Sequence, residues 1–129
     1  MFFSQGIYAT SLLLGWIAAL LSVIGVSTAI WARVHLGRDW SPRPAMKVDH
    51  KLVTSGPYAY VRHPIYTGVI LMAFGAAFTG SFFGIGIFVI ASIVYVSRIW
   101  REERIMLELF PNEYPEYQKR TKRLIPFVW

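Results

Sequence analysis

Residues 65–97 read IYTGVILMAFGAAFTGSFFGIGIFVIASIVYVS, a run of 33 positions without a charged side chain. As one helix this run would extend about 50 Å, which exceeds the hydrocarbon core of a bilayer, about 30 Å. Glycine and other small residues are concentrated in its middle, at 75–86, and favour a turn there. We therefore predict a helical hairpin with a tight turn near 79–84 and with arms at 65–80 and 83–109.

A second apolar run precedes the hairpin. Residues 7–32 contain no charged side chain and would extend about 39 Å as a helix, enough to cross a bilayer with some tilt. This run is too long for the hydrophobic region of a signal peptide, so we expect it to be retained as a span. Hydrophobic residues make up 55% of the 129-residue chain, more than a soluble core needs. The sequence thus predicts an all-α membrane protein, a single integral membrane domain over 1–129 with three transmembrane helices.

Charged residues are confined to two segments, 33–64 and 98–129. All thirteen Lys and Arg residues and all seven acids lie there, and the net charge is +6. Because cytoplasmic loops of membrane proteins are enriched in Lys and Arg, we expect both segments on the cytoplasmic face, including a short amphipathic helix before Pro126. The N-terminus and the hairpin turn then lie outside, in a multi-pass protein of the cell inner membrane. Such a basic face suits anionic membrane lipids, and we expect no nucleic acid partner.

The most distinctive motif, VTSGPYAYVRHPIYTG at 53–68, lies where the chain re-enters the membrane. Pro64 suits the first turn of a helix, since it has no N–H group to leave unpaired, and Gly68 permits close approach of another backbone or a ligand. Arg62 and His63 are therefore expected at a helix N-terminus, which favours an anion such as a carboxylate or a phosphate. In the alternative interpretation, Arg62 extends to lipid phosphates and His63 only fills space at the interface.

A second motif, RIWREER at 98–104, lies at the cytoplasmic end of the last predicted span. Because Glu102 and Glu103 are adjacent on a helix, one faces inward if the other faces solvent. An inward acid near the membrane needs a partner, either Arg98 or Arg101 in a structural ion pair or a ligand cation. The two motifs together would form a pocket for a zwitterion. Cysteine is absent, which excludes thiolate chemistry, and we expect no metal site.

These motifs carry a family resemblance. GPYAYVRHPIYTG, an apolar hairpin and EERIMLELFPNEYPEYQKRTKRLIP follow one another over about residues 35–129, an order that resembles the isoprenylcysteine carboxyl methyltransferase family. Its superfamily also includes phospholipid N-methyltransferases. The resemblance implies S-adenosylmethionine as the cofactor. It also implies two catalytic residues, Arg120 and Glu103, of which Arg120 would orient a substrate carboxylate. The residues that it implies for the cofactor site are Tyr58, Arg62, His63, Tyr66, Gly68, Glu102 and Glu103.

The methyl acceptor is predicted to be lipid-like or prenylated and to enter sideways from the bilayer. A carboxylate acceptor needs no general base at neutral pH, whereas an amine acceptor must lose a proton, for which a nearby Glu or His is a candidate. The eukaryotic enzymes of the family have more membrane helices before the shared core, so a second protomer could complete the acceptor site in a homo-oligomer. Two alternatives stay open: an NADPH-dependent membrane reductase with a similar core, and a non-catalytic scaffold or lipid-binding protein.

Overall fold

The computed structural model describes residues 2–37 and 52–129, with side chains from residue 11 onward. Across this described part the chain forms four α-helices, one short 3-10 helix and no β-strand, so the predicted all-α class is confirmed there. In chain order the elements are α1 (Phe2–Leu36), the 3-10 helix η3 (Gly56–Ala59), α2 (Pro64–Ala77), α3 (Phe82–Leu109) and α4 (Glu113–Arg120).

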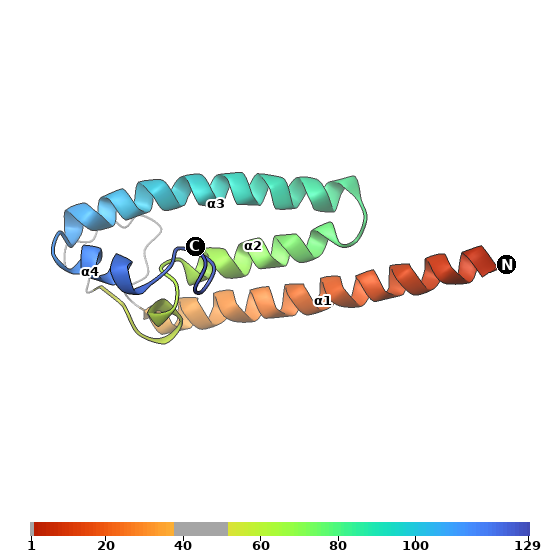
Figure 1. Ribbon diagram of the computed structural model, residues 1–129, viewed down its shortest axis with the longest axis horizontal. Helices are drawn as coiled ribbons and strands as arrows, with labels where there is room; N and C mark the ends of the chain where they lie inside the picture. Colours follow the sequence, from red (N-terminus) through yellow and green to blue (C-terminus); the bar gives the residue numbers. More distant parts are fainter. Residues whose placement is uncertain (1, 38–51) are drawn as a thin grey trace.

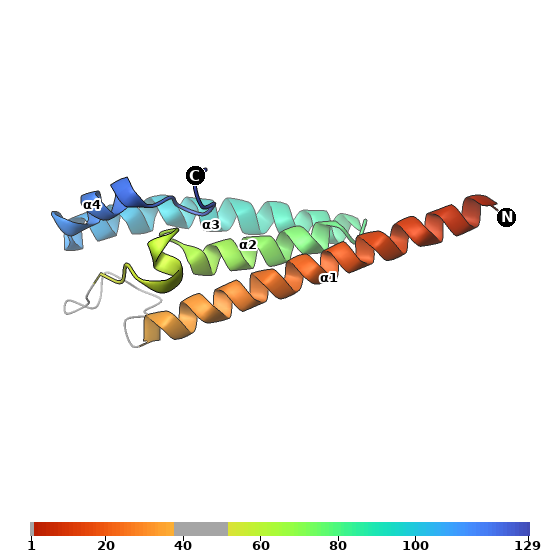
Figure 2. The same cartoon turned by 60° about the horizontal axis from the view of Figure 1, so that its bottom comes forward.

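Helices α1, α2 and α3 run side by side, and α2 lies between the other two (Figures 1 and 2). The N-terminal part of α1 projects beyond the turn between α2 and α3, whereas α4 lies at the opposite end of the bundle (Figure 1). Charged side chains of the described residues belong to the end of α1, the start of α2, the last turns of α3, and α4 and the chain after it. These segments meet at one end of the bundle, so charged and apolar residues are separated along its axis.

The predicted helical hairpin is present, with its turn at residues 78–81. Gly80 has a positive φ of 77°, a conformation that glycine adopts without steric cost. Ser81 caps α3, because its hydroxyl accepts a hydrogen bond of 3.0 Å from the N–H group of Gly84. Gly84 also packs against the carbonyl oxygen of Ala76, where a larger residue would clash. Small residues therefore determine where the chain reverses.

Within the described residues, two helices are long and apolar enough to cross a bilayer: Ser11–Leu36 of α1 and the whole of α3. Helix α2 is also apolar, but its 14 residues extend only about 21 Å, less than a hydrocarbon core of about 30 Å. The predicted arm at 65–80 ran past the observed end of this helix at Ala77. The helix lengths support an all-helical membrane protein with two candidate spans.

Small residues bring the backbones of α1 and α2 into direct contact. A Cβ atom added to Gly25 would lie 2.5 Å from the carbonyl oxygen of Gly68 and 2.6 Å from the backbone nitrogen of Met72. A Cβ atom added to Gly75 would lie 2.9 Å from the carbonyl oxygen of Ala18. Apolar helices in lipid associate through such close van der Waals contacts. The close approach predicted at Gly68 is therefore made by the backbone of α1.

The chain after α4, which we call the C-terminal segment (residues 121–129), returns to the start of α2. The N–H group of Arg62 donates to the carbonyl oxygen of Lys122 at 2.8 Å. The N–H group of His63 donates to the carbonyl oxygen of Arg123 at 3.1 Å. The first bond belongs to an isolated parallel bridge between Val61 and Lys122, and the second extends the pairing of the two segments by one residue. The pairing places the start of α2 beside residues that follow it by about sixty positions in the sequence.

Replacement of Gly25 by Ala should destabilise the protein, because the added methyl group meets backbone atoms of α2 and the two helices must separate. We expect a loss of about 1–3 kcal/mol in the free energy of unfolding, seen as a lower midpoint of thermal unfolding in detergent by circular dichroism. Gly15→Ala is the matched control, since a Cβ atom there meets no described atom within 4 Å. A midpoint for Gly25→Ala equal to that of the control would contradict the packing.

Candidate active site

His63 and Pro64 begin helix α2, as the sequence predicts. His63 is the N-cap residue and Pro64 occupies the first turn, where its missing N–H group costs no hydrogen bond. The His63 side chain does not cap the helix, so its imidazole contacts other groups. Before it, Gly56 adopts a positive φ of 61° and opens the 3-10 helix η3, which turns the chain toward α2.

The Glu103 carboxylate lies at the centre of the site and has three partners. Its Oε1 atom accepts a hydrogen bond from Arg62 Nε at 2.7 Å and lies 3.2 Å from His63 Nε2. Its Oε2 atom accepts from Arg123 Nε at 3.2 Å. The Glu103 side chain is only 5% exposed, and the positive and polar partners compensate for its removal from water. Glu103 thus connects α3, the start of α2 and the C-terminal segment.

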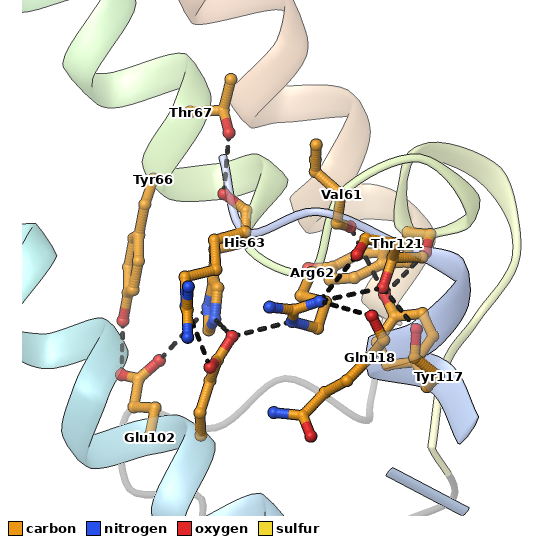
Figure 3. A network of polar contacts seen from close by, with 12 residues as sticks. Val61, Arg62, His63, Tyr66, Thr67, Glu102, Tyr117, Gln118 and Thr121 are labelled. Atoms are coloured by element: carbon orange, nitrogen blue, oxygen red, sulfur yellow. Dashed lines mark hydrogen bonds and ion pairs between the residues drawn. The ribbon is translucent and has the colours of Figure 1, made fainter. Parts of the chain in front are cut away.

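The Arg62 guanidinium has further partners on its other side (Figure 3). Its Nη1 atom donates to the carbonyl oxygen of Thr121 at 2.8 Å and to that of Gln118 at 3.3 Å. The Arg62 side chain is 6% exposed and lies between Glu103 and the end of α4. The alternative in which Arg62 extends to lipid phosphates is therefore wrong, because its hydrogen bonds are made inside the protein.

Glu102 faces the same site but is less enclosed. It accepts hydrogen bonds from the Tyr66 hydroxyl and, at 3.4 Å, from Arg98 Nη2, and its Oε2 atom lies 3.9 Å from His63 Nδ1 (Figure 3). Its side chain is 17% exposed, against 5% for Glu103. Both acids point into the site, since adjacent helix positions differ by about 100° and a broad face accommodates both. Glu102 keeps access to solvent or to a ligand.

Aromatic rings form one wall of the site. The rings of His63 and Tyr66 are stacked with an interplanar angle of 2° and centroids 5.8 Å apart, and the Tyr95 ring lies 4.8 Å from that of Tyr66. The Arg98 guanidinium lies over Tyr66, 5.5 Å from its centroid. Aromatic faces beside the carboxylate of Glu102 suit a positively charged group of a ligand.

Tyr58 lies on the side of the site that faces α1. Its ring stacks on that of His35, with centroids 6.5 Å apart, and its carbonyl oxygen accepts a hydrogen bond of 2.6 Å from the Tyr117 hydroxyl. Burial raises the pKa of Tyr58 to about 12 and also raises the pKa of Tyr117. Both phenols are therefore protonated at neutral pH, and Tyr117 serves as a donor that holds the turn before Arg62.

The structure brings most of the predicted site residues together. Five of the eight form one connected cluster: Arg62, His63, Tyr66, Glu102 and Glu103. The other three lie apart from it: Tyr58 stacks on His35 of α1, Gly68 packs on α1, and Arg120 is exposed at the end of α4. Arg98 pairs with Glu102, as one of the predicted alternatives had it. The more deeply buried Glu103 instead pairs with Arg62 and Arg123, neither of which was among the partners predicted for the inward acid.

Arg123 belongs to the site although its position in the sequence does not predict it. Besides its bond to Glu103, its guanidinium lies 4.5 Å from the centroid of the Trp100 ring and 5.3 Å from that of Trp129. In the sequence it belongs to the basic run KRTKR at 119–123, where nothing distinguishes it from its neighbours. Only the pairing of the C-terminal segment with the start of α2 brings it to α3.

Comparisons of the chain with known proteins show the family to which it is similar. The model of the isoprenylcysteine carboxyl methyltransferase (ICMT) family matches residues 16–108. The chain belongs to this family. The match covers α2, α3 and most of α1, and it includes both acids and the start of α2.

Three relatives of this ICMT-family chain cover most of its length. It is 37% identical over 101 residues to protein-S-isoprenylcysteine O-methyltransferase of Schizosaccharomyces pombe, covering 75% of this chain and 43% of that protein. It is 33% identical over 114 residues to cobalt-zinc-cadmium resistance protein CzcN of Cupriavidus metallidurans, covering 86% and 51%. It is 32% identical over 122 residues to protein-S-isoprenylcysteine O-methyltransferase of Saccharomyces cerevisiae, covering 87% and 48%. The chain spans about half the length of these relatives.

Replacement of Glu103 by Gln should destabilise the protein more than replacement of Glu102 by Gln. The first change leaves Arg62 and Arg123 beside a neutral amide in a buried place, for which we expect a loss of roughly 3 kcal/mol. The second removes a more exposed charge, with an expected loss of less than about 1 kcal/mol. Thermal unfolding in detergent measures both, with the exposed Glu108→Gln as the control. Equal midpoints for the two variants would show that Glu103 is not the centre of the network.

Proposed function

We propose that this chain is an S-adenosylmethionine-dependent methyltransferase that acts at the membrane on a lipid-like or prenylated acceptor. The observation that carries the proposal is that the motifs at 53–68 and 98–104 meet in a chain of this family. The hydrogen bonds from Tyr66 to Glu102 and between His63 and Glu103 join the start of α2 to the end of α3, at the charged end of an apolar bundle. Two of the three relatives named above are O-methyltransferases of prenylated cysteine.

The residues present fit a zwitterionic cofactor with a positively charged centre. Glu102 offers a partly exposed carboxylate, and the rings of Tyr66 and His63 lie beside it. The N-terminus of α2 has no side-chain cap, and a helix N-terminus attracts a carboxylate. When bound, S-adenosylmethionine would supply a methyl group on a sulfonium for transfer to the acceptor. We propose that Glu102, His63 and Tyr66 contact it, while Arg62, Glu103, Tyr58 and Gly68 contribute by holding these groups in place.

The chain's contribution to catalysis would be mainly positioning, because methyl transfer requires donor and acceptor in line. We propose that Arg120, which is exposed on α4, orients a carboxylate acceptor. Such an acceptor is already ionised at neutral pH and needs no general base. For an amine acceptor Glu103 or His63 would be the candidate base. Glu103 already has three hydrogen-bonding partners, so it is less suited to accept a proton from a substrate. This supports a carboxylate acceptor, which needs no base, over an amine.

The membrane arrangement that we propose makes α2 and α3 a hairpin of two spans and α1 a third, in one domain over residues 1–129. The protein would lie in the inner membrane of the cell, and its charged end would face the cytoplasm. The N-terminus would then lie outside the cytoplasm and the C-terminus within it. The cofactor would bind to the segments 33–64 and 98–129; residues 38–51 of the first lie outside the described residues. The acceptor would enter from the surrounding lipid, and a second copy of the chain could complete its site.

The first test is binding of S-adenosylhomocysteine, the product form of the cofactor, to the purified protein in detergent and in lipid. We expect calorimetry to detect binding of this compound and not of NADPH. Glu102→Gln and His63→Ala should each weaken binding about tenfold, because each removes one polar contact to a charged ligand. The exposed Glu113→Gln is the control and should bind as the unmodified protein does. Binding of NADPH alone would favour the reductase, and binding of neither compound would favour the scaffold.

The second test identifies the acceptor. Protein in native membranes is supplied with S-adenosylmethionine that carries a labelled methyl group, and the lipid extract is then treated with base. A methyl ester of a carboxylate hydrolyses and releases labelled methanol, whereas a methylated amine keeps its label. We expect base-labile label, in line with a carboxylate acceptor, and its loss in Glu102→Gln. Label that is stable to base would show an amine acceptor. Glu103 and His63 would then be the candidates for the general base.

A further inference from the structure

Arg123 holds three parts of the protein together through separate atoms. Its main-chain carbonyl oxygen accepts from the N–H group of His63 at 3.1 Å, and its Nε atom donates to Glu103 Oε2 at 3.2 Å. The guanidinium carbon lies over the ring of Trp100, 4.5 Å from its centroid, and over the ring of Trp129, 5.3 Å from its centroid. Two aromatic faces restrict where this cation can lie, since the attraction to each ring depends on position over its face.

The two oxygens of Glu103 are shared between different segments. Oε1 faces Arg62 and His63 from the start of α2, and Oε2 faces Arg123 from the C-terminal segment. A carboxylate that is held on one oxygen only can rotate about its side chain, whereas donors on both oxygens fix its plane. The orientation of Glu103, and with it the place of the His63 imidazole 3.2 Å away, therefore depends on Arg123.

We propose that Arg123 is a positioning residue of the cofactor site: with its guanidinium over the rings of Trp100 and Trp129, it fixes the Glu103 carboxylate and thereby the His63 side chain. The inference rests on the proposed function, because the proposed function is what makes His63, the side chain that Arg123 positions, a contact of the cofactor. The Arg123 side chain itself lies one step away, since its guanidinium group contacts Glu103 and the two tryptophan rings.

The segment that carries Arg123 is attached without its side chain. The Thr67 hydroxyl donates to the carbonyl oxygen of Leu124 at 2.7 Å, and Arg62 N–H donates to that of Lys122 at 2.8 Å. Without the Arg123 guanidinium, Glu103 also keeps the 2.7 Å bond from Arg62. A variant at Arg123 should therefore keep the fold while the geometry of Glu103 and His63 is relaxed.

The test compares Arg123→Gln with Lys122→Gln, which removes the same charge from an exposed side chain at the next position. We expect Arg123→Gln to weaken S-adenosylhomocysteine binding about tenfold, because a charged hydrogen bond that orders the site is lost. Lys122→Gln should change the affinity by less than about twofold. Arg123→Lys keeps the charge and a donor, and should recover part of the loss.

A mutant cycle separates positioning from general loss of structure. In a His63→Ala background, Arg123→Gln should cost less than about twofold in affinity, since the group that it positions is gone. All affinities are measured well below the unfolding midpoint of each variant. The same tenfold loss in both backgrounds, or unchanged affinity of Arg123→Gln in the unmodified background, would overturn the inference. If the unmodified protein itself does not bind S-adenosylhomocysteine, the proposed function fails, and the inference fails with it.

Discussion

The arrangement of the charged end depends on one buried carboxylate. Glu103 lies on a helix that is otherwise apolar over most of its length, and its side chain is 5% exposed. A carboxylate in such a place is tolerated only with positive or hydrogen-bonding partners. These partners come from the start of α2 and from the C-terminal segment. The need to compensate one charge thus draws together three segments that are distant in the sequence.

The apolar part of the bundle makes this meeting possible. Glycines at 25 and 68 bring α1 and α2 within backbone contact, and the turn at 78–81 returns the chain along α2 as α3. Because α3 is twice as long as α2, its last turns extend past the start of α2. The C-terminal segment lies in that region and pairs with residues 61–63. Helix length and the position of the turn therefore decide which residues of α3 face residues 62–64.

The two adjacent acids have different surroundings, and this difference is the basis for separate roles. Both oxygens of Glu103 accept bonds from cationic side chains, so it is suited to hold the site rather than to bind a ligand. Glu102 bonds to Tyr66 and Arg98 and is more exposed, with aromatic rings beside it. Under the function proposed for this chain, the same sequence motif would then supply one positioning carboxylate and one that meets the cofactor.

Local features of the sequence were enough to predict the apolar helices, a hairpin turn close to the observed one and the start of α2 at Pro64. The meeting of residues 62–66 with the paired acids was predicted from the charge pattern across the membrane together with the family resemblance. Glycine, proline and hydrophobic runs act on their own neighbourhood, so their effects can be predicted without the rest of the chain. The length of α2, the use of Gly68 in helix packing, the choice of Glu103 as the enclosed acid and the part of Arg123 came only with the tertiary structure. Each depends on a partner far away in the sequence, and a basic residue in a basic run shows nothing locally of the carboxylate that it will meet.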